Sequence, residues 1–129
     1  MRVVAEVGDG FNLFDVTPEE LERKSQLLER YCSEIGRNAR EIERSVGVDV
    51  VVGKTRDEVK EKVARLKMAA RGGETTLEEY LSKNIVGTPD ECIQKIQRYA
   101  DFGVRHFIIS MRTLRDDQKL FAEEIMKSF

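Results

Sequence analysis

Basic side chains stand directly after two apolar runs that predict buried strands. Lys54 follows the first run, Ser110 ends the second run, and Arg112 and Arg115 come shortly after it. Function in parallel βα units lies at the carboxyl ends of the strands, where positive charge can hold a phosphate group. The alternative, which the charges favour, is that these are solvated rim residues, because the adjacent helix starts are acidic and would repel an anion. The acidic residues are Asp57, Glu58, Asp116 and Asp117.

Three other polar side chains lie within or beside predicted strands. Asn12 shares one side of its strand with Phe14, so it can hydrogen-bond a ligand ring or bond locally at the strand end. Asp49 interrupts a run of valines, where it either meets a ligand as a base or faces water from an edge strand. We favour the edge strand, because a buried unpaired carboxylate is costly. His106 has no Ser, Cys or carboxylate at a spacing that indicates a catalytic partner, so it is a weak candidate.

Composition argues against several classes of function. The formal net charge of -2 argues against broad binding to nucleic acid or an anionic membrane. No apolar run reaches the length of a membrane span, and no signal-peptide pattern opens the chain, so we expect a cytoplasmic protein. Cys32 and Cys92 belong to no CxxC motif, and His106 is the one histidine, so we expect no metal site. The glycines form neither a GxGxxG motif nor a Walker loop.

The elements that must position these side chains alternate between strands and amphipathic helices. Apolar runs predict strands at 10–14, 45–53 and 105–110, among four to five helices. Four helix starts share a threonine followed three residues later by glutamate, which predicts a capping box. They are TPEE at 17–20, TRDE at 55–58, TLEE at 76–79 and TPDE at 88–91. This order predicts an α/β fold with a parallel sheet, in a single domain over residues 1–129.

The segment 86–110 combines these signals in one unit. It begins as a loop, after which Thr88 predicts a helix N-cap and Pro89 occupies the first helical position. Gly103 predicts the end of that helix. The consecutive apolar residues that follow predict a parallel strand covered on both faces.

Four stretches, in this order, carry a resemblance to a known family. They are RVVAEVGDGFNLF at 2–14, YCSEIGRNAREI at 31–42, VGTPDECIQKIQRYADFGVRHFIIS at 86–110 and LFAEEIMKSF at 120–129. The chain resembles the C-terminal part of the luciferase-like oxidoreductases, which include flavin-dependent monooxygenases and enzymes that use a deazaflavin coenzyme. The resemblance implies an eight-stranded TIM barrel, FMN or a deazaflavin as cofactor, and hydride transfer or flavin-dependent oxygenation. The candidate cofactor-binding residues are then Asn12, Lys54, Ser110, Arg112 and Arg115.

The length departs from the family pattern. A TIM barrel takes about 250 residues and eight strands, so we expect an incomplete barrel that is not catalytically complete alone. The short helix expected at residues 1–8 is marginal by itself, which indicates that further units precede it. Open strand edges favour a homo-oligomer or a partner chain that supplies the missing strands. The alternatives are a non-catalytic oligomerisation or regulatory module and one subunit of a split enzyme.

Overall fold

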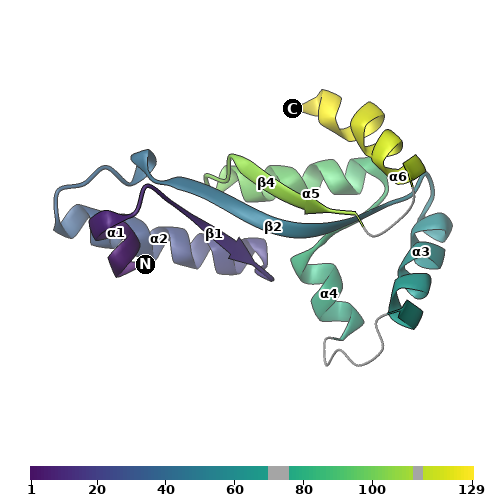
Figure 1. The fold of residues 1–129 in the computed structure, drawn as a ribbon, viewed down its shortest axis with the longest axis horizontal. Helices are drawn as coiled ribbons and strands as arrows, with labels where there is room; N and C mark the ends of the chain where they lie inside the picture. The colour runs from purple at the N-terminus through teal and green to yellow at the C-terminus, as the bar shows by residue number, and fades with distance from the viewer. Residues whose placement is uncertain (70–75, 112–114) are drawn as a thin grey trace. The chain divides into compact units, whose positions relative to one another are not determined.

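Strands and helices alternate along the chain (Figure 1). The computed structural model describes residues 1–69, 76–111 and 115–129. The strands are β1 (Gly10–Phe14), β2 (Glu43–Val52), β3 (Ile85–Gly87) and β4 (His106–Ser110). The helices are α1 (Arg2–Val7), α2 (Pro18–Glu34), α3 (Arg56–Ala69), α4 (Leu77–Lys83), α5 (Pro89–Asp101) and α6 (Arg115–Leu120). Short turns of 3₁₀ or π-helix cover Ala39–Glu41, Phe121–Ile125 and Met126–Ser128.

The strands form a sheet with β2 at its centre. Strand β1 pairs in parallel with Glu43–Gly47, and β3 pairs in parallel with Val50–Val52. Strand β4 also pairs with β2. The described strands do not close into a barrel, so the prediction of parallel βα units that form an incomplete barrel is confirmed.

Strand β3 is an addition to the three predicted strands. The sequence predicts a loop at the start of the segment 86–110, whereas Ile85–Gly87 forms a short strand there. The loop prediction was wrong because three residues are too few to show a strand periodicity. Their pairing with Val50–Val52 creates this strand, and local sequence does not report that pairing.

The predicted capping boxes are confirmed at the starts of α2 and α4. Thr17 accepts a hydrogen bond from the Glu20 N–H group, and the Glu20 carboxylate accepts one from the Thr17 N–H group. Thr76 and Glu79 make the same two bonds in α4. These bonds satisfy N–H groups that the first helical turn leaves without partners, so each helix has a defined first residue.

The chain divides into two compact units. The first contains residues 1–47 and 98–108, and the second contains residues 48–97 and 109–129. Strand β2, helix α5 and strand β4 each contribute residues to both units.

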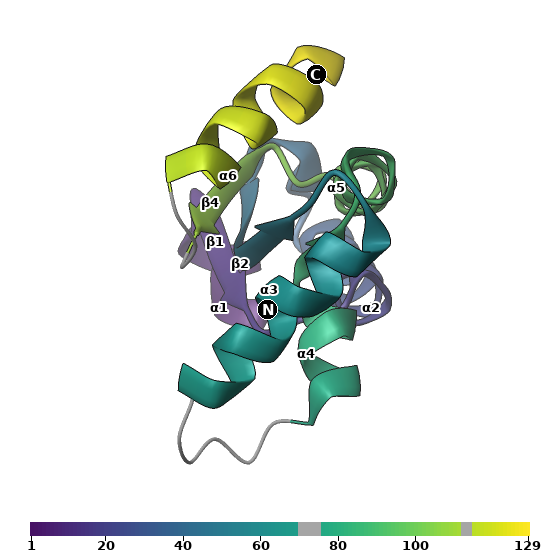
Figure 2. The same cartoon turned by 90° about the vertical axis from the view of Figure 1, so that its right-hand side faces the viewer.

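The first unit is built around contacts between α1, α2 and the 3₁₀ turn that precedes β2. Its core cluster includes Ala5, Leu28, Cys32 and Ile42. Helix α2 and the end of α5 lie on one side of the unit's strands (Figure 2). Alternate residues of β1 on the other side are exposed, which leaves that side of the sheet open.

Arg37 fixes the end of α1 in the first unit. Its guanidinium donates hydrogen bonds to the carbonyl oxygens of Ala5 at 2.9 Å and Gly8 at 2.6 Å, and it reaches that of Val4 at 3.4 Å. The Val4 carbonyl also accepts from the Gly8 N–H group at 2.9 Å, whereas those of Ala5 and Gly8 lie at the helix end, where the helix itself supplies no donor. Arg37 thereby replaces the missing helical turn and holds the segment that leads into β1.

The second unit packs α3 and α4 against the end of β2. Val51 is 1% exposed and forms a cluster with Val59 and Val63 of α3. Leu77 of α4 and Val86 of β3 pack against the same cluster. The 48–52 half of β2 is therefore covered within its own unit.

Candidate functional site

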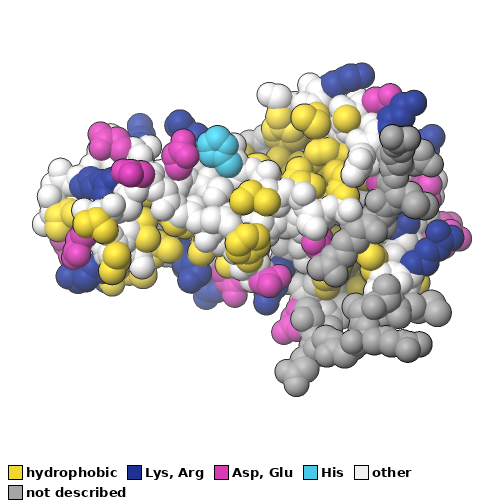
Figure 3. Space-filling model, viewed as in Figure 1, with side chains coloured by type: hydrophobic (Ala, Val, Ile, Leu, Met, Phe, Trp, Pro, Cys, Tyr) yellow, Lys and Arg dark blue, Asp and Glu magenta, His cyan; other side chains and the backbone are white. Residues whose placement is uncertain are grey.

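On the open side of the first unit's sheet, the carboxyl end of β1 pairs with the middle of β2. Strand register places Asn12 beside Ser45 and Phe14 beside Gly47. Carboxyl ends of parallel strands are where ligand sites form in α/β folds. Exposed hydrophobic side chains gather on this side, over β1 and β4 (Figure 3).

Phe14 lies directly over Gly47. A β-carbon built on Gly47 would meet the Phe14 Cε1 atom at 2.0 Å, so the ring occupies the space that any side chain there would need. The ring nevertheless remains 64% exposed, and Ile108 on β4 is 54% exposed. Glycine within a strand commonly marks such a close approach. The exposed side chains of Phe14 and Ile108 form an apolar surface on this side of the sheet, which we call the apolar wall.

Polar groups border this wall. The Ser45 hydroxyl lies 2.9 Å from Asn12 Oδ1 and 3.2 Å from the Phe11 carbonyl oxygen, and it can donate its proton to one of them. Asn12 therefore bonds to the neighbouring strand, and its contact with a cofactor stays a prediction. Strand β1 ends at Phe14, and the next residue, Asp15, has a φ of 53°, in the left-handed region that residues other than glycine seldom adopt.

His106 and Glu43 form a pair that the sequence did not indicate. Their Nε2 and Oε1 atoms lie 3.5 Å apart, with both side chains more than half exposed. The sequence shows no carboxylate at a spacing that indicates a partner for His106, and the pairing of β4 with β2 brings Glu43 beside it. The pair lies at the amino ends of β2 and β4, away from the strand ends where sites usually form.

Lys54 and Ser110 both belong to the second unit and lie at strand ends as expected. The Lys54 side chain is exposed, while its backbone N–H donates to Glu58 Oε2 at 2.6 Å. Thr55 Oγ1 accepts from the Glu58 N–H group, which is one bond of the predicted capping box, whereas the Glu58 carboxylate accepts from Lys54 and not from Thr55. Ser110 is the exposed last residue of β4. Arg112 and the side chain of Arg115 lie outside the described residues, so the phosphate site stays a prediction.

Asp49 does not lie on an edge strand. Strand β2 has β1 and β3 as neighbours and also pairs with β4, so the edge interpretation was wrong. The Tyr80 hydroxyl donates a hydrogen bond to Asp49 Oδ2 at 3.2 Å. The Asn84 side chain accepts from the Asp49 N–H group at 2.8 Å. The carboxylate and the backbone N–H group of Asp49 are therefore each bonded by a residue that is distant in sequence.

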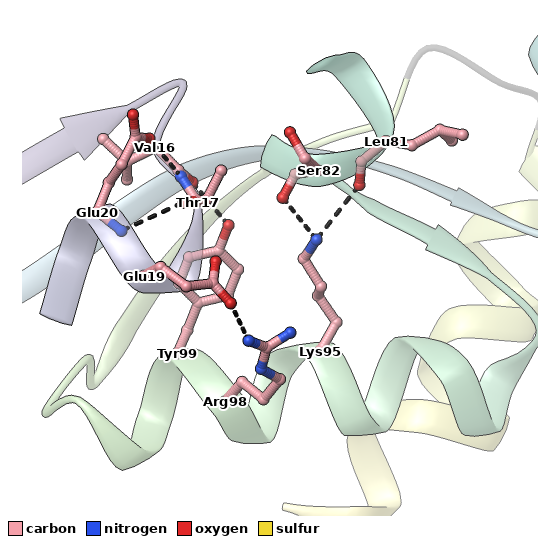
Figure 4. A network of polar contacts seen from close by, with 9 residues as sticks. All are labelled: Val16, Thr17, Glu19, Glu20, Leu81, Ser82, Lys95, Arg98 and Tyr99. Carbon is pink, nitrogen blue, oxygen red and sulfur yellow. Dashed lines mark hydrogen bonds and ion pairs between the residues drawn. The ribbon is translucent and has the colours of Figure 1, made fainter. Parts of the chain in front are cut away.

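Helix α5 carries several polar contacts that hold neighbouring segments (Figure 4). In the first unit, the Tyr99 hydroxyl donates to the Val16 carbonyl oxygen at 2.7 Å, and Arg98 forms an ion pair with Glu19. In the second unit, Lys95 donates to the carbonyl oxygens of Leu81 and Ser82. These contacts fix helix ends and are structural.

Burial argues against proton transfer by two further groups on α5. Burial raises the pKa of the Cys92 thiol to about 12. Burial also raises the pKa of Tyr99 well above its ordinary value. Both groups stay protonated near neutral pH, so neither serves as a base or a thiolate nucleophile.

Two other kinds of site were searched for in the described ranges. No three His, Cys, Asp or Glu side chains there converge as a metal ion would require. None of the helices in these ranges combines the length and apolar character of a membrane crossing.

Comparison with known proteins identifies relatives of this fold. Residues 1–106 match the family model of luciferase-like monooxygenases. No curated protein matches the chain.

Several solved structures share the fold. The coenzyme F420-dependent tetrahydromethanopterin reductase of Methanopyrus kandleri superposes with a TM-score of 0.72 at 17% identity, over 99% of this chain and 47% of that protein. The long-chain alkane monooxygenase LadA superposes with a TM-score of 0.74 at 18% identity, over 98% of this chain and 37% of that protein. The EDTA monooxygenase of Chelativorans sp. BNC1 superposes with a TM-score of 0.71 at 16% identity, over 98% of this chain and 43% of that protein. The chain thus spans less than half the length of these proteins.

Proposed function

The chain belongs to the luciferase-like monooxygenase family, and we propose that it forms one side of a flavin-type cofactor pocket in an oxidoreductase or monooxygenase. The observation that carries this proposal is the exposed Phe14 ring, which lies over Gly47 where the carboxyl end of β1 pairs in parallel with the middle of β2. When bound, FMN or a deazaflavin such as F420 supplies hydride transfer, and FMN also supplies oxygenation chemistry.

The residues on this side of the first unit fit a flat heteroaromatic ring. Aromatic rings stack on one another with an offset, and the open face of Phe14 is available for such stacking. Asn12 and Ser45 supply polar atoms beside the wall, and small-molecule sites combine an apolar lining with few polar groups. We keep Lys54, Ser110, Arg112 and Arg115 as proposed contacts of the cofactor's phosphate, because they follow strand ends.

We also propose that strands from another polypeptide complete the barrel, either from a second copy or from a different chain. The chain spans 47% or less of the compared proteins, which supports a pocket with further walls. Val3 and Val7 lie one helical turn apart on α1 and are 70% and 77% exposed. Exposed apolar side chains on one side of a helix favour contact with another protein surface. We expect light scattering to give a mass above that of one chain, and a stable monomer would contradict this part of the proposal.

The cofactor proposal is tested by titrating the purified chain with FMN and with F420 while following cofactor fluorescence. We expect saturable binding in the micromolar range. The Gly47→Ala variant should weaken it about tenfold, because the new methyl group would displace the Phe14 ring from its place on the strand. Phe14→Leu should weaken it similarly.

Phe129→Leu is the matched control, since Phe129 is also an exposed phenylalanine, at 61%. It should bind the cofactor as the unmodified chain does. Absence of saturable binding at high micromolar cofactor, or equal effects of Phe14→Leu and Phe129→Leu, would contradict the proposed site.

A further inference from the structure

A cavity of about 490 Å³ lies beside α2 in the first unit. Its walls come from α2, from the segment 39–44 and from the turn 101–105 between α5 and β4. Small-molecule sites have volumes of roughly 300–1,000 Å³, so the cavity is large enough for a small organic ligand. Strand alternation directs Arg44 of this cavity to the side of β2 opposite Ser45, so its guanidinium and the apolar wall lie on different sides of the sheet.

The Arg44 side chain gives the cavity a fixed positive group. It is 9% exposed, and its guanidinium donates to the Phe102 carbonyl oxygen at 2.9 Å and to Glu29 Oε1 at 3.2 Å. A guanidinium has five N–H donors, so these two bonds leave donors for another acceptor. Gly103 makes room for this group, because a β-carbon built there would meet Arg44 Nη1 at 2.8 Å.

Two more arginines border the cavity. Arg40 and Arg105 are exposed, and neither side chain makes an ion pair or a hydrogen bond within the part of the chain that the structure describes. Single exposed arginines are commonly solvated, but here two of them share one cavity with a buried third. Planar guanidinium groups bind carboxylate and phosphate groups through paired hydrogen bonds. These arginines therefore favour an oxyanion.

The acidic residues that line the cavity all have partners of their own. They are Glu22, Glu29, Glu43 and Asp101. Their charges still repel an anion, and the repulsion grows with the anion's charge. A carboxylate carries one negative charge, whereas a phosphate monoester carries roughly two. The lining therefore favours a carboxylate over a phosphate group.

We propose that this cavity binds a small organic molecule through a carboxylate group, which Arg40 and Arg105 hold beside Arg44. Phe102 and Ile42 supply apolar atoms to the lining, which suits the organic part of such a ligand. The cavity lies at the amino ends of β2 and β4, away from the strand ends proposed for the cofactor. The binding therefore goes beyond the proposed function and does not depend on it.

The proposal is tested with benzoate and benzamide, which have similar shapes but differ in charge. Both are titrated at constant ionic strength while the nuclear magnetic resonance signals of the Phe102 and Gly103 N–H groups are followed. Benzoate should shift both signals in a saturable way, and benzamide should bind at least about tenfold more weakly, because it carries no negative charge. Equal affinity for the two probes, or no saturable shift with millimolar benzoate, would overturn the proposal.

Variants of the exposed arginines test which groups hold the carboxylate. Arg40→Gln and Arg105→Gln should each weaken benzoate binding about tenfold, because each removes a charge-assisted hydrogen bond. Both side chains are exposed, so both variants should fold. Arg23→Gln is the matched control, because Arg23 is exposed on α2 outside the cavity. It should bind benzoate as the unmodified chain does.

Equal losses of benzoate affinity in all three variants would show a general effect of charge and would overturn the site. Titration of the same variants with FMN separates this site from the cofactor site. Arg40→Gln and Arg105→Gln should leave cofactor affinity unchanged, so failure of cofactor binding and failure of carboxylate binding give different results.

Discussion

The two halves of strand β2 meet different surroundings. Residues 43–47 belong to the first unit, where the side of the sheet away from α2 carries the exposed Phe14 ring. Residues 48–52 belong to the second unit, where Val51 is covered by α3 and Asp49 is bonded by Tyr80. The first half of this strand therefore lies beside an exposed aromatic ring, whereas the second half is covered by a helix. Substitutions should affect stability strongly in the second half and weakly on the open side of the first.

The largest loss of stability should follow removal of an ion pair in the second unit. Lys62 Nζ lies 2.5 Å from Asp117 Oδ1 and 2.7 Å from the Val52 carbonyl oxygen, at the end of β2. The Asp117 side chain is 6% exposed, and its Oδ2 atom has no hydrogen-bond partner among the described residues. Lys62→Met would leave a buried carboxylate without its cation, which should cost about 3 kcal/mol of unfolding free energy in urea.

Lys60→Met is the control for that loss, because Lys60 is exposed on the same helix. It should change the unfolding free energy by less than about 0.5 kcal/mol. Equal losses in the two variants would show that the buried pair does not stabilise the second unit.

A smaller loss of stability should follow truncation of a buried valine in the second half of β2. Val51 is 1% exposed, so Val51→Ala should cost about 2 kcal/mol. Ile108 on the open side is 54% exposed, and Ile108→Ala should cost less than about 1 kcal/mol although it removes a larger side chain. Urea unfolding of both variants tests the difference, and the reverse order would contradict the assignment of an open side.

Ser45→Ala, on the open side, should leave the thermal stability nearly unchanged. The Ser45 hydroxyl bonds Asn12 or the Phe11 carbonyl near solvent, where water can replace either bond. Thermal unfolding should shift by no more than about 2 °C. A larger shift would mean that this side is packed, which would remove the reason to place a ligand there.

The smallest effect should be a change in how the stability of the second unit depends on pH in acid. The Thr88 N–H group, and then the Arg56 guanidinium, hold the pKa of Glu91 below its ordinary value of 4.5. A lowered folded-state pKa stabilises the protein above the unfolded value, and this stabilisation is lost as pH falls through the folded value. Glu91→Gln should therefore reduce the steepness of acid unfolding below pH 4.5, and Arg56→Gln should reduce it less. Identical acid profiles in all three proteins would contradict this assignment.

Local signals in the sequence predicted much of the fold. The threonine–glutamate boxes placed the starts of α2 and α4, because a capping box involves residues three apart. Gly36 and Gly103 have φ values of 72° and 89°, the left-handed conformation expected where a glycine ends a helix. Each of these signals lies within one turn of the chain.

Contacts between distant segments account for what the sequence missed. Asp49 was assigned to an edge because neither Tyr80 nor Asn84 stands near it in the sequence. The partnership of His106 with Glu43 and the contact of Phe14 with Gly47 likewise depend on strand pairing. The close approach at Gly47 had a signal, since glycine inside a valine-rich strand is unfavourable and commonly marks one.

The hydrogen bonds from Arg37 to the end of α1 affect the order in which the first unit folds during synthesis. Helix α1 has six residues, which is too short to persist alone in water. Its terminal carbonyl groups gain their partner only when Arg37 has been added, after all of α2. Because a chain is made in the direction from its amino to its carboxyl end at a finite rate, the residues of α1 leave the ribosome before the segment that holds them. Helix α1 is therefore among the later parts of the first unit to take its final shape.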